Sequence, residues 1–149
     1  MINNLVHSGI FIQLIGFVAF VLSLLIFQVN KRSSMLRIQM VACLLYAIHF
    51  FMLGAYTGAA MNVAGVARNF SFDKLKKSRH SWVLPILFIT IFFIAAILTW
   101  QGPRSLLPAI ASIGGTLAVW QQNTRMIRLL SLLSPPLWLT YNVLSGSYP

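Results

Sequence analysis

Acidic residues are almost absent from this chain: among 149 residues, one Asp stands against 11 Lys and Arg, and charged residues make up 8% of the total. A soluble domain normally carries about 25% charged residues, so the composition excludes an ordinary water-exposed surface. Hydrophobic residues make up 58% of the chain, and the mean hydropathy is +0.82. These values are typical of a protein that lies in a lipid bilayer.

Most catalytic chemistry is excluded by the same shortage. A hydrolase, a metal site or a phosphate-binding loop requires acids, clustered His and Cys, or a Gly-rich loop that ends in Lys. One Asp, three His and the lone Cys43 do not supply such a set. We therefore expect no catalytic residue, no metal ligand, no cofactor and no enzymatic activity, and the single cysteine excludes an intrachain disulfide.

The net charge of +10 raises the question of nucleic-acid binding. A nucleic-acid surface gathers its basic residues on one polar face, whereas the basic residues of this chain stand at the ends of apolar segments. Membrane proteins retain Lys and Arg at the cytoplasmic edge of the bilayer. We therefore expect the partner to be the lipid bilayer and not a nucleic acid.

Six apolar segments approach the length of about 20 residues that a helix needs to cross a bilayer. In chain order they are Gly9 to Gln28, Ile38 to Tyr56, Thr57 to Phe70, Trp82 to Trp100, Leu106 to Gln121 and Leu129 to Gly146. Residues 1–8 contain no Lys or Arg, so we expect the first segment to be a retained span and not a cleaved signal peptide. The third segment is short and rich in Gly and Ala, which let helices approach closely, so we expect its neighbours to enclose it.

The positions of the basic residues test this number of spans. Ten of the 11 fall on one side, in or beside the connections that follow spans one, three and five, and only Arg104 falls on the other side. The positive-inside rule then places these connections, including the basic loop 71–81, in the cytoplasm and the amino terminus outside. Arg68 stands near the cytoplasmic end of the third span, and we interpret it as a charge that snorkels or faces a loop.

The chain repeats itself in one consistent register, with offsets of 93, 91 and 92 residues. Phe27-Gln28-Val29-Asn30-Lys31-Arg32 recurs as Trp120-Gln121-Gln122-Asn123-Thr124-Arg125, Met35-Leu36-Arg37 recurs as Met126-Ile127-Arg128, and Gly54-Ala55-Tyr56 recurs as Gly146-Ser147-Tyr148. Duplication at this spacing in an apolar chain is typical of transporters built from repeated helical units.

The repeat predicts a division of the chain into two units. We expect residues 1–70 to form a first three-helix repeat, residues 82–100 a connector helix and residues 101–149 an incomplete second repeat. A unit with an odd number of spans inserts upside down when it is repeated directly, and one additional crossing restores its orientation. The two units are then parallel repeats, related by an axis along the membrane normal.

Short motifs resemble known membrane proteins. The segments Phe27-Gln28, Asn30 to Ser34 and Leu44 to Gly54 resemble the first two helices of the SWEET, SemiSWEET and PQ-loop superfamily. The segments His49 to Tyr56, Gly58-Ala59-Ala60 and Ser105 to Pro108, together with Arg68, more closely resemble the bacterial inner-membrane family called YgjV, which is grouped with those carriers.

This resemblance implies an all-α protein of the bacterial cytoplasmic membrane with a SWEET-like triple-helix-bundle repeat (helices one to three), connector helix four and an incomplete second repeat (helices five and six). The superfamily has a seventh helix, and we expect this chain to be truncated before it. In the superfamily an Asn on helix three faces the substrate, and the resemblance implies Asn62 for that role. Association with a second copy of the chain stays open.

Polar groups inside the spans are candidates for a solute pathway, because each needs a partner or water in the hydrocarbon. An aromatic residue followed three residues later by a polar one occurs in the second span, and the repeat places a similar set in the sixth span. The candidate pathway residues are Tyr46, His49, Asn62, Trp138, Tyr141 and Asn142. Two interpretations stay open: these side chains line a central cavity, or His49 and Asn142 bond to neighbouring helices.

Two pairs of residues are candidate hinges. Pro135 and Pro136 break backbone hydrogen bonding within the sixth span, and Gly114 and Gly115 loosen the fifth. The sequence as a whole predicts a facilitative carrier of a small polar solute, such as a sugar, that works by alternating access. The alternative is a non-transporting membrane protein that serves as a scaffold or binds a partner.

Overall fold

The computed structural model describes residues 2–74 and 81–148, and the side chains from residue 9 onward. In chain order the helices are α1 (Ile2–Leu25), η1 (Ile26–Gln28), α2 (Arg32–Met52), α3 (Tyr56–Lys74), α4 (Val83–Leu98), η2 (Pro103–Ser105), α5 (Leu106–Trp120), α6 (Thr124–Ser131) and α7 (Pro135–Leu144). These residues contain helices and no strand, so the predicted all-α class is confirmed for the described part of the chain.

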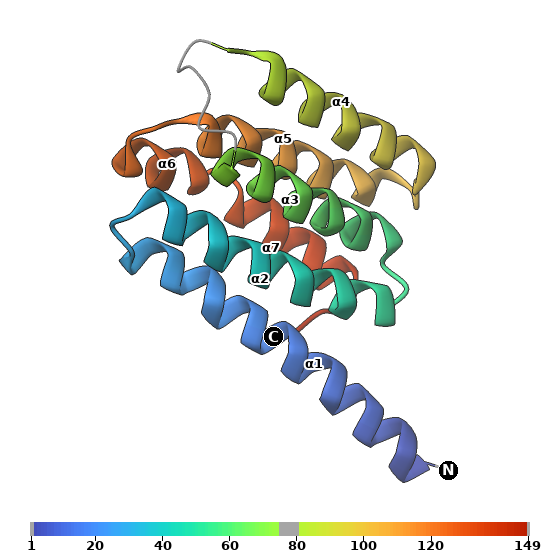
Figure 1. Ribbon diagram of the computed structural model, residues 1–149. Helices are drawn as coiled ribbons and strands as arrows, with labels where there is room; N and C mark the ends of the chain where they lie inside the picture. The colour runs from blue at the N-terminus through green and yellow to red at the C-terminus, as the bar shows by residue number, and fades with distance from the viewer. Residues whose placement is uncertain (1, 75–80, 149) are drawn as a thin grey trace.

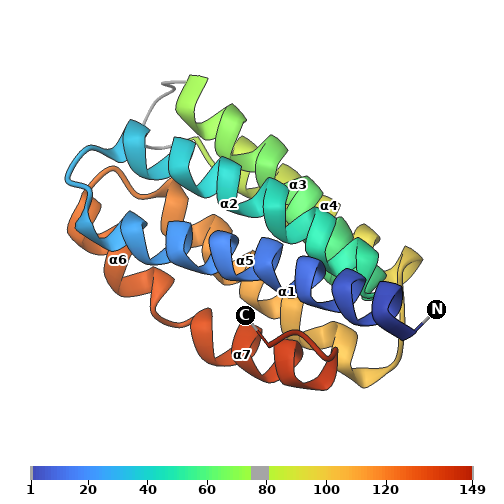
Figure 2. The ribbon, with the colours of Figure 1, turned by 90° about the horizontal axis from the view of Figure 1, so that it is seen from below.

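The long helices lie side by side, with α1 along one edge of the bundle and α4 along the opposite edge (Figure 1). Helix α3 packs against α2, α4 and α5, while α5 also packs against α6 and α7. Seen from below, α1 and α7 lie on the same side of the molecule, and the end of the chain lies between them (Figure 2). Neighbours therefore cover the face of α3 that carries Gly58 and Gly65, whereas Val63 and Phe70 on its other face are exposed, so the predicted enclosure is found on one face only.

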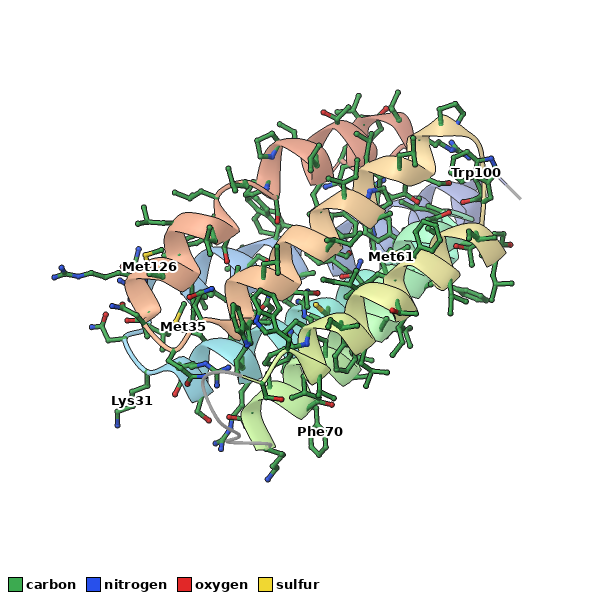
Figure 3. All side chains as sticks on the ribbon, turned by 90° about the horizontal axis from the view of Figure 1, so that it is seen from above. Lys31, Met35, Met61, Phe70, Trp100 and Met126 are labelled. Carbon is green, nitrogen blue, oxygen red and sulfur yellow. The ribbon has the colours of Figure 1, made fainter. Side chains whose placement is uncertain are left out.

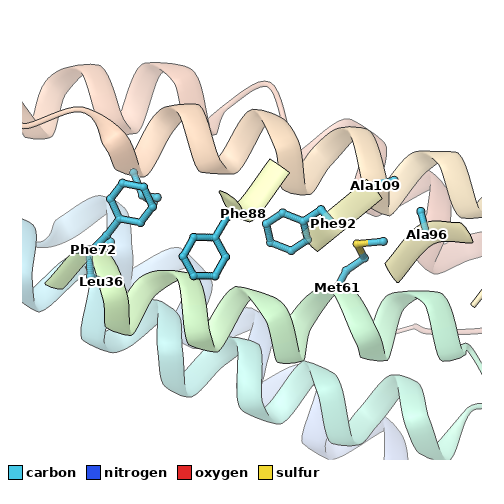
Figure 4. Close-up of a cluster of buried hydrophobic side chains, with 8 residues drawn as sticks. Leu36, Met61, Phe72, Phe88, Phe92, Ala96 and Ala109 are labelled. Atoms are coloured by element: carbon cyan, nitrogen blue, oxygen red, sulfur yellow. The ribbon is translucent and has the colours of Figure 1, made fainter. Parts of the chain in front are cut away.

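The main apolar cluster lies where α3, α4 and α5 meet, and its side chains fill the space between α3 and α5 (Figure 4). Its buried members are Leu36, Met61, Phe72, Phe88, Phe92, Ala96, Ala109 and Val119. Two glycines permit close packing of α3 against α7 and α2: a Cβ added at Gly58 would lie 2.6 Å from Cε1 of Tyr141, and one added at Gly65 would lie 3.3 Å from Sγ of Cys43.

The outer surface is strongly apolar. Large hydrophobic side chains are exposed along both edge helices, including Phe11 on α1 at 57% and Leu98 on α4 at 79%. A large exposed apolar surface marks contact with a membrane or a partner. Two segments, Gly9–Gln28 and Arg32–Met52, are long and apolar enough to cross a bilayer, and Val83–Leu98 is a shorter apolar helix. The remaining predicted spans and their orientation stay predictions.

The helices extend beyond the predicted spans. Helix α2 begins at Arg32, ahead of the predicted start at Ile38, and α3 continues to Lys74, beyond the predicted end at Phe70. Hydropathy identifies only the apolar part of a helix. The backbone hydrogen bonds of the helix continue into polar residues until a helix-breaking residue is reached. Of the predicted basic loop 71–81, the first four residues form the last turn of α3, and residues 75–80 lie outside the described residues.

The predicted sixth span consists of two helices. Helix α6 begins at Thr124 and ends at Ser131, and α7 begins at the proline pair. Proline has no N–H to donate to the preceding turn and is well suited to the first turn of a helix, so Pro135 and Pro136 begin a new helix. The break falls where the prolines predicted it, and movement about it stays a prediction.

Helices α2 and α7 end in the same backbone turn. Gly54 and Gly146 have positive φ angles of 71° and 70°. The N–H of Ala55 donates to the Phe50 carbonyl at 2.9 Å, and the N–H of Ser147 donates to the Asn142 carbonyl at 2.9 Å. These are Schellman motifs, in which glycine supplies the left-handed residue. Because of this turn, the chain reverses at corresponding places in the two predicted repeats.

Candidate functional site

Aromatic side chains join α2 to α7. Phe50 lies at the centre, with ring centroids 5.8 Å from Tyr46, 5.8 Å from Trp138 and 5.5 Å from Tyr141. The structure therefore brings three of the predicted pathway residues together around Phe50, which was not among them. Its position one turn after Tyr46 was the signal that could have identified it. Phe50 and Tyr141 are each 1% exposed, whereas Tyr46 and Trp138 are partly buried.

His49 joins three parts of the chain. Its Nδ1 lies 2.8 Å from the carbonyl oxygen of Ile12 on α1, and its Nε2 lies 2.7 Å from Oγ of Ser147. A carbonyl can only accept, so Nδ1 carries the proton and Nε2 accepts from the Ser147 hydroxyl. Both ring nitrogens therefore have partners in neighbouring segments, and a place for His49 in a solute pathway stays a prediction.

Tyr141 and Asn62 both bind the backbone of Gly58 on α3. The hydroxyl of Tyr141 accepts the N–H of Gly58 at 2.9 Å and donates to the Ala55 carbonyl at 3.5 Å. The side-chain amide of Asn62 donates to the carbonyl of the same Gly58 at 2.9 Å. The first N–H groups of a helix lack partners within it, so Tyr141 caps the start of α3 and holds α7 against it.

Asn142 is left with an open acceptor. Its Oδ1 is buried and has no hydrogen-bond partner among the described residues, and the same holds for Oγ of Ser145. A buried acceptor without a partner costs about 1–3 kcal/mol, so this position next to Tyr141 suits a donor supplied from outside the chain. Bonding of the Asn142 side chain to a neighbouring helix is not found at this oxygen.

One pair of contacts between the two predicted repeats joins corresponding residues. His49 binds Ser147, and Tyr141, which corresponds to His49 at the offset of 92, binds Ala55, which corresponds to Ser147. Two glutamines, which do not themselves correspond in the register, bind the corresponding glycines of the two turns. Gln13 donates to the carbonyl of Gly146 at 3.0 Å, and Gln101 donates to the carbonyl of Gly54 at 2.9 Å.

Two arginines join the predicted repeats at the other end of the bundle, although they do not correspond in the register of the repeat, which aligns Arg32 with Arg125 and Arg37 with Arg128. Arg32, at the start of α2, donates to the Gln121 carbonyl at 3.1 Å, just beyond the end of α5. Arg128, on α6, donates to the Val29 carbonyl at 2.7 Å, just beyond the end of η1. Each arginine thus binds carbonyls that the end of a helix leaves without partners, and each reaches from one predicted repeat to the other.

The same basic end holds the single acidic residue of the chain, Asp73. One oxygen of its carboxylate accepts from the Ser33 hydroxyl, and the other pairs with Nε of Arg37 at 3.2 Å. The hydrogen bond from Ser33, with the smaller contribution of Arg37, holds the pKa of this carboxyl below its usual value. In the part of the chain that the structure describes, no three His, Cys, Asp or Glu residues lie close enough to hold a metal ion.

The interpretation of Arg68 as a snorkelling charge is wrong. Its side chain is 4% exposed and lies in the interior, between α3, α4 and α5. Nε donates to Oδ1 of Asn69 at 3.2 Å, and Nη1 donates to the Ser112 carbonyl at 3.2 Å. Helix α3 continues past Arg68 to Lys74, so the arginine lies more than a turn inside the helix, on the face that its neighbours cover.

The glycine pair of α5 lies within an uninterrupted helix. A Cβ added at Gly115 would lie 3.1 Å from Nη1 of Arg68, whereas one added at Gly114 would meet only Oγ of Ser134, at 3.9 Å. Gly115 therefore leaves room for the buried guanidinium. The hinge function of the pair stays a prediction.

Comparison with known proteins identifies one family. A family model described as Imp-YgjV, bacterial inner membrane protein, matches residues 10–149. No curated protein matches the chain, and no solved structure matches it.

Proposed function

Since the chain belongs to the YgjV family of bacterial inner membrane proteins, we propose that it is a facilitative carrier of a small polar solute. The carrier works by alternating access: two halves rock about a solute site between them. The first half comprises α1, α2 and α3, and the second comprises α5, α6 and α7. Helix α4 connects them.

The observation that carries this proposal is the reciprocity of the contacts between the halves. His49 binds Ser147, and the corresponding residues Tyr141 and Ala55 bind each other. Gln13 and Gln101 bind the carbonyls of the corresponding glycines Gly146 and Gly54. Reciprocal contacts of this kind are expected between two parallel repeats that are related by a two-fold axis along the membrane normal. The shared turn at Gly54 and Gly146 supports the same relation.

The distribution of residues along the bundle supports the proposed orientation. Lys31 and Met126 lie at one end, and Trp100 lies at the opposite end (Figure 3). Lysine at the cytoplasmic edge and tryptophan at the headgroup level are the arrangement that the positive-inside rule and the aromatic belts favour. The amino terminus is then outside, and the links before α2 and α6 are cytoplasmic.

The proposed solute pathway follows α3 and includes the aromatic group between α2, α3 and α7. Aromatic rings of Phe50 and Trp138 offer flat apolar surfaces, and Asn142 offers an open acceptor. In the present conformation these rings stack on one another, so a solute enters only after α7 moves away from α2. Movement at the break before Pro135 would separate Tyr141 from Gly58 and Ala55.

Since no carboxylate lies within the predicted spans, we propose passage down a gradient without proton coupling through Asp or Glu.

The test is counterflow in liposomes that contain the purified protein, with a panel of labelled sugars and other small polar metabolites. We expect at least one solute to exchange, and we expect Trp138→Ala and Asn62→Ala to reduce that exchange at least tenfold. Leu139→Ala is the matched control on α7, because Leu139 is 65% exposed. Absence of exchange across the panel, in protein that is folded, would favour the scaffold or partner-binding alternative.

A further inference from the structure

We propose that the solute of this carrier is a small monocarboxylate anion and that Arg68 binds its carboxylate at the junction of α3, α4 and α5. The identification of the anion as the transported solute rests on the function proposed above, whereas its binding at Arg68 does not.

The charge of Arg68 has no acidic counterpart. The chain contains one acidic residue, Asp73, and both oxygens of its carboxylate are engaged, one by Ser33 and the other by Arg37. Arg68 contacts only neutral groups: Oδ1 of Asn69, the carbonyl of Ser112, and Oγ1 of Thr116 at 3.5 Å. A buried charge is normally paired, and an ionisable residue within a membrane bundle commonly marks a substrate or ion pathway.

A second, independent feature adjoins the guanidinium. Asn69 is 0% exposed, and its Nδ2 has no hydrogen-bond partner among the described residues. The amide cannot be turned around, because Nδ2 would then face the Nε–H of Arg68, and two donors do not bond. Its N–H groups therefore remain available next to the cation. Arginine and an unpartnered amide together supply the donors that a carboxylate accepts.

The apolar surroundings of Arg68 favour a ligand with a single negative charge. The guanidinium lies over the ring of Phe92, 5.6 Å from its centroid, and Phe92 belongs to the main apolar cluster (Figure 4). In such surroundings one negative charge neutralises one arginine, whereas a divalent anion would leave an excess charge buried. The planar guanidinium also matches the two oxygens of a carboxylate. A monovalent carboxylate fits both conditions.

The position of Arg68 connects this site to the proposed movement of the halves. Arg68 and Asn69 lie on α3 of the first half, whereas Ser112 and Thr116 lie on α5 of the second. Asn62 lies about two turns before Asn69 on α3, and Asn62 and Tyr141 both bind Gly58. A carboxylate held by Arg68 would therefore sit between the halves, where a rocking movement exposes it.

The binding test uses the purified full chain in detergent, with propionate as the probe and thermal unfolding as the measurement. Propionamide, a neutral molecule of the same shape, and chloride at equal ionic strength are the controls. A ligand that binds only the folded protein raises the unfolding temperature with its concentration. We expect propionate to raise it in a saturable way, propionamide and chloride to leave it unchanged, and Arg68→Met to abolish the rise.

A second pair of variants retains the arginine and covers the case in which Arg68→Met does not fold. Gly115→Ala places a methyl group 3.1 Å from Nη1 of Arg68, and Gly114→Ala, the matched control, meets only Ser134 at 3.9 Å. We expect the apparent propionate affinity to fall at least fivefold in Gly115→Ala and to stay unchanged in Gly114→Ala.

The proposal is overturned if propionate produces no rise, if propionamide produces the same rise, or if the two glycine variants bind propionate equally well. Counterflow of labelled propionate distinguishes a failure of the Arg68 site from a failure of the proposed carrier function. Binding without counterflow would leave the Arg68 site in place and reject the carrier. Counterflow of a neutral sugar by a protein that does not bind propionate would reject the anion site and retain the carrier.

Discussion

At the residue scale, the packing of α3 depends on a few side chains that were visible in the sequence and on one that was misjudged. The small residues of the third span predicted close packing, and Gly58 and Gly65 are buried. The interpretation of Arg68 as a snorkelling charge rested on its position near the end of the third span. Its helical face was the better guide, because Gly58, Asn62, Gly65 and Arg68 recur every three or four residues and therefore share one side of the helix.

Gly58 offers the sharpest test at this scale. A Cβ there would lie 2.6 Å from the ring of Tyr141, so Gly58→Ala must push α7 away from α3 and weaken the bond from the Gly58 N–H. We expect destabilisation of about 1–3 kcal/mol, the usual cost of overpacking, measured by thermal unfolding in detergent. Gly9→Ala is the control, because nothing lies within 4 Å of the added group. Equal stability of the two variants would contradict the packing described here.

Asp73 predicts a pH dependence. The hydrogen bond from Ser33 and the nearby Arg37 lower the pKa of its carboxyl in the folded protein. A carboxyl whose pKa is lowered by folding stabilises the protein above its unfolded pKa of about 3.9, and this contribution is lost as the pH falls through the folded value. We expect Asp73→Asn to be less stable than the wild type at pH 7 and the difference to shrink as the medium is acidified below about pH 4. A difference that does not change with pH would show that the charge of Asp73 does not stabilise the fold.

At the element scale, the sequence predicted the order and approximate place of the helices better than their ends. The proline pair gave the break between α6 and α7 because a proline cannot continue the hydrogen bonding of a helix. The start of α2 at Arg32 and the end of α3 at Lys74 could not be found from apolar runs, since these turns are polar and are held by contacts with distant segments, such as Arg32 to Gln121 and Ser33 to Asp73.

The turns after α2 and α7 make a prediction for a matched pair of glycines. Gly54 and Gly146 both have φ near 70°, and nothing lies within 4 Å of a Cβ added at either one. A substitution therefore incurs mainly the backbone strain of a left-handed L-residue, about 1–2 kcal/mol.

We expect Gly54→Ala and Gly146→Ala to lower the stability by similar amounts, with a smaller loss for Asn at each position because Asn tolerates this conformation better. Thermal unfolding of the four variants is the measurement. A loss confined to one of the two glycines would argue against equivalent turns.

At the scale of the whole molecule, the sequence predicts two corresponding units, but it could not predict that the corresponding residues His49 and Tyr141 each bind a residue of the other predicted unit. The pairing of His49 with Ser147 and of Tyr141 with Ala55 depends on how the helices pack, and periodicity along one chain carries no such information. The polar residues of the second and sixth spans were identified from sequence. Their closed packing around Phe50 and the burial of Arg68 required the three-dimensional structure.

The central claim is that the two halves lie in the membrane with the same orientation, and labelling of introduced cysteines from outside intact cells tests it most directly. In a Cys43→Ser background, Lys31→Cys and Thr124→Cys mark corresponding positions of the halves, and Gly102→Cys marks the opposite end of the bundle. The account predicts that a membrane-impermeant maleimide labels Gly102→Cys in intact cells and labels the other two only after the membrane is opened. Labelling of one of the corresponding pair from outside, with its counterpart protected, would contradict it.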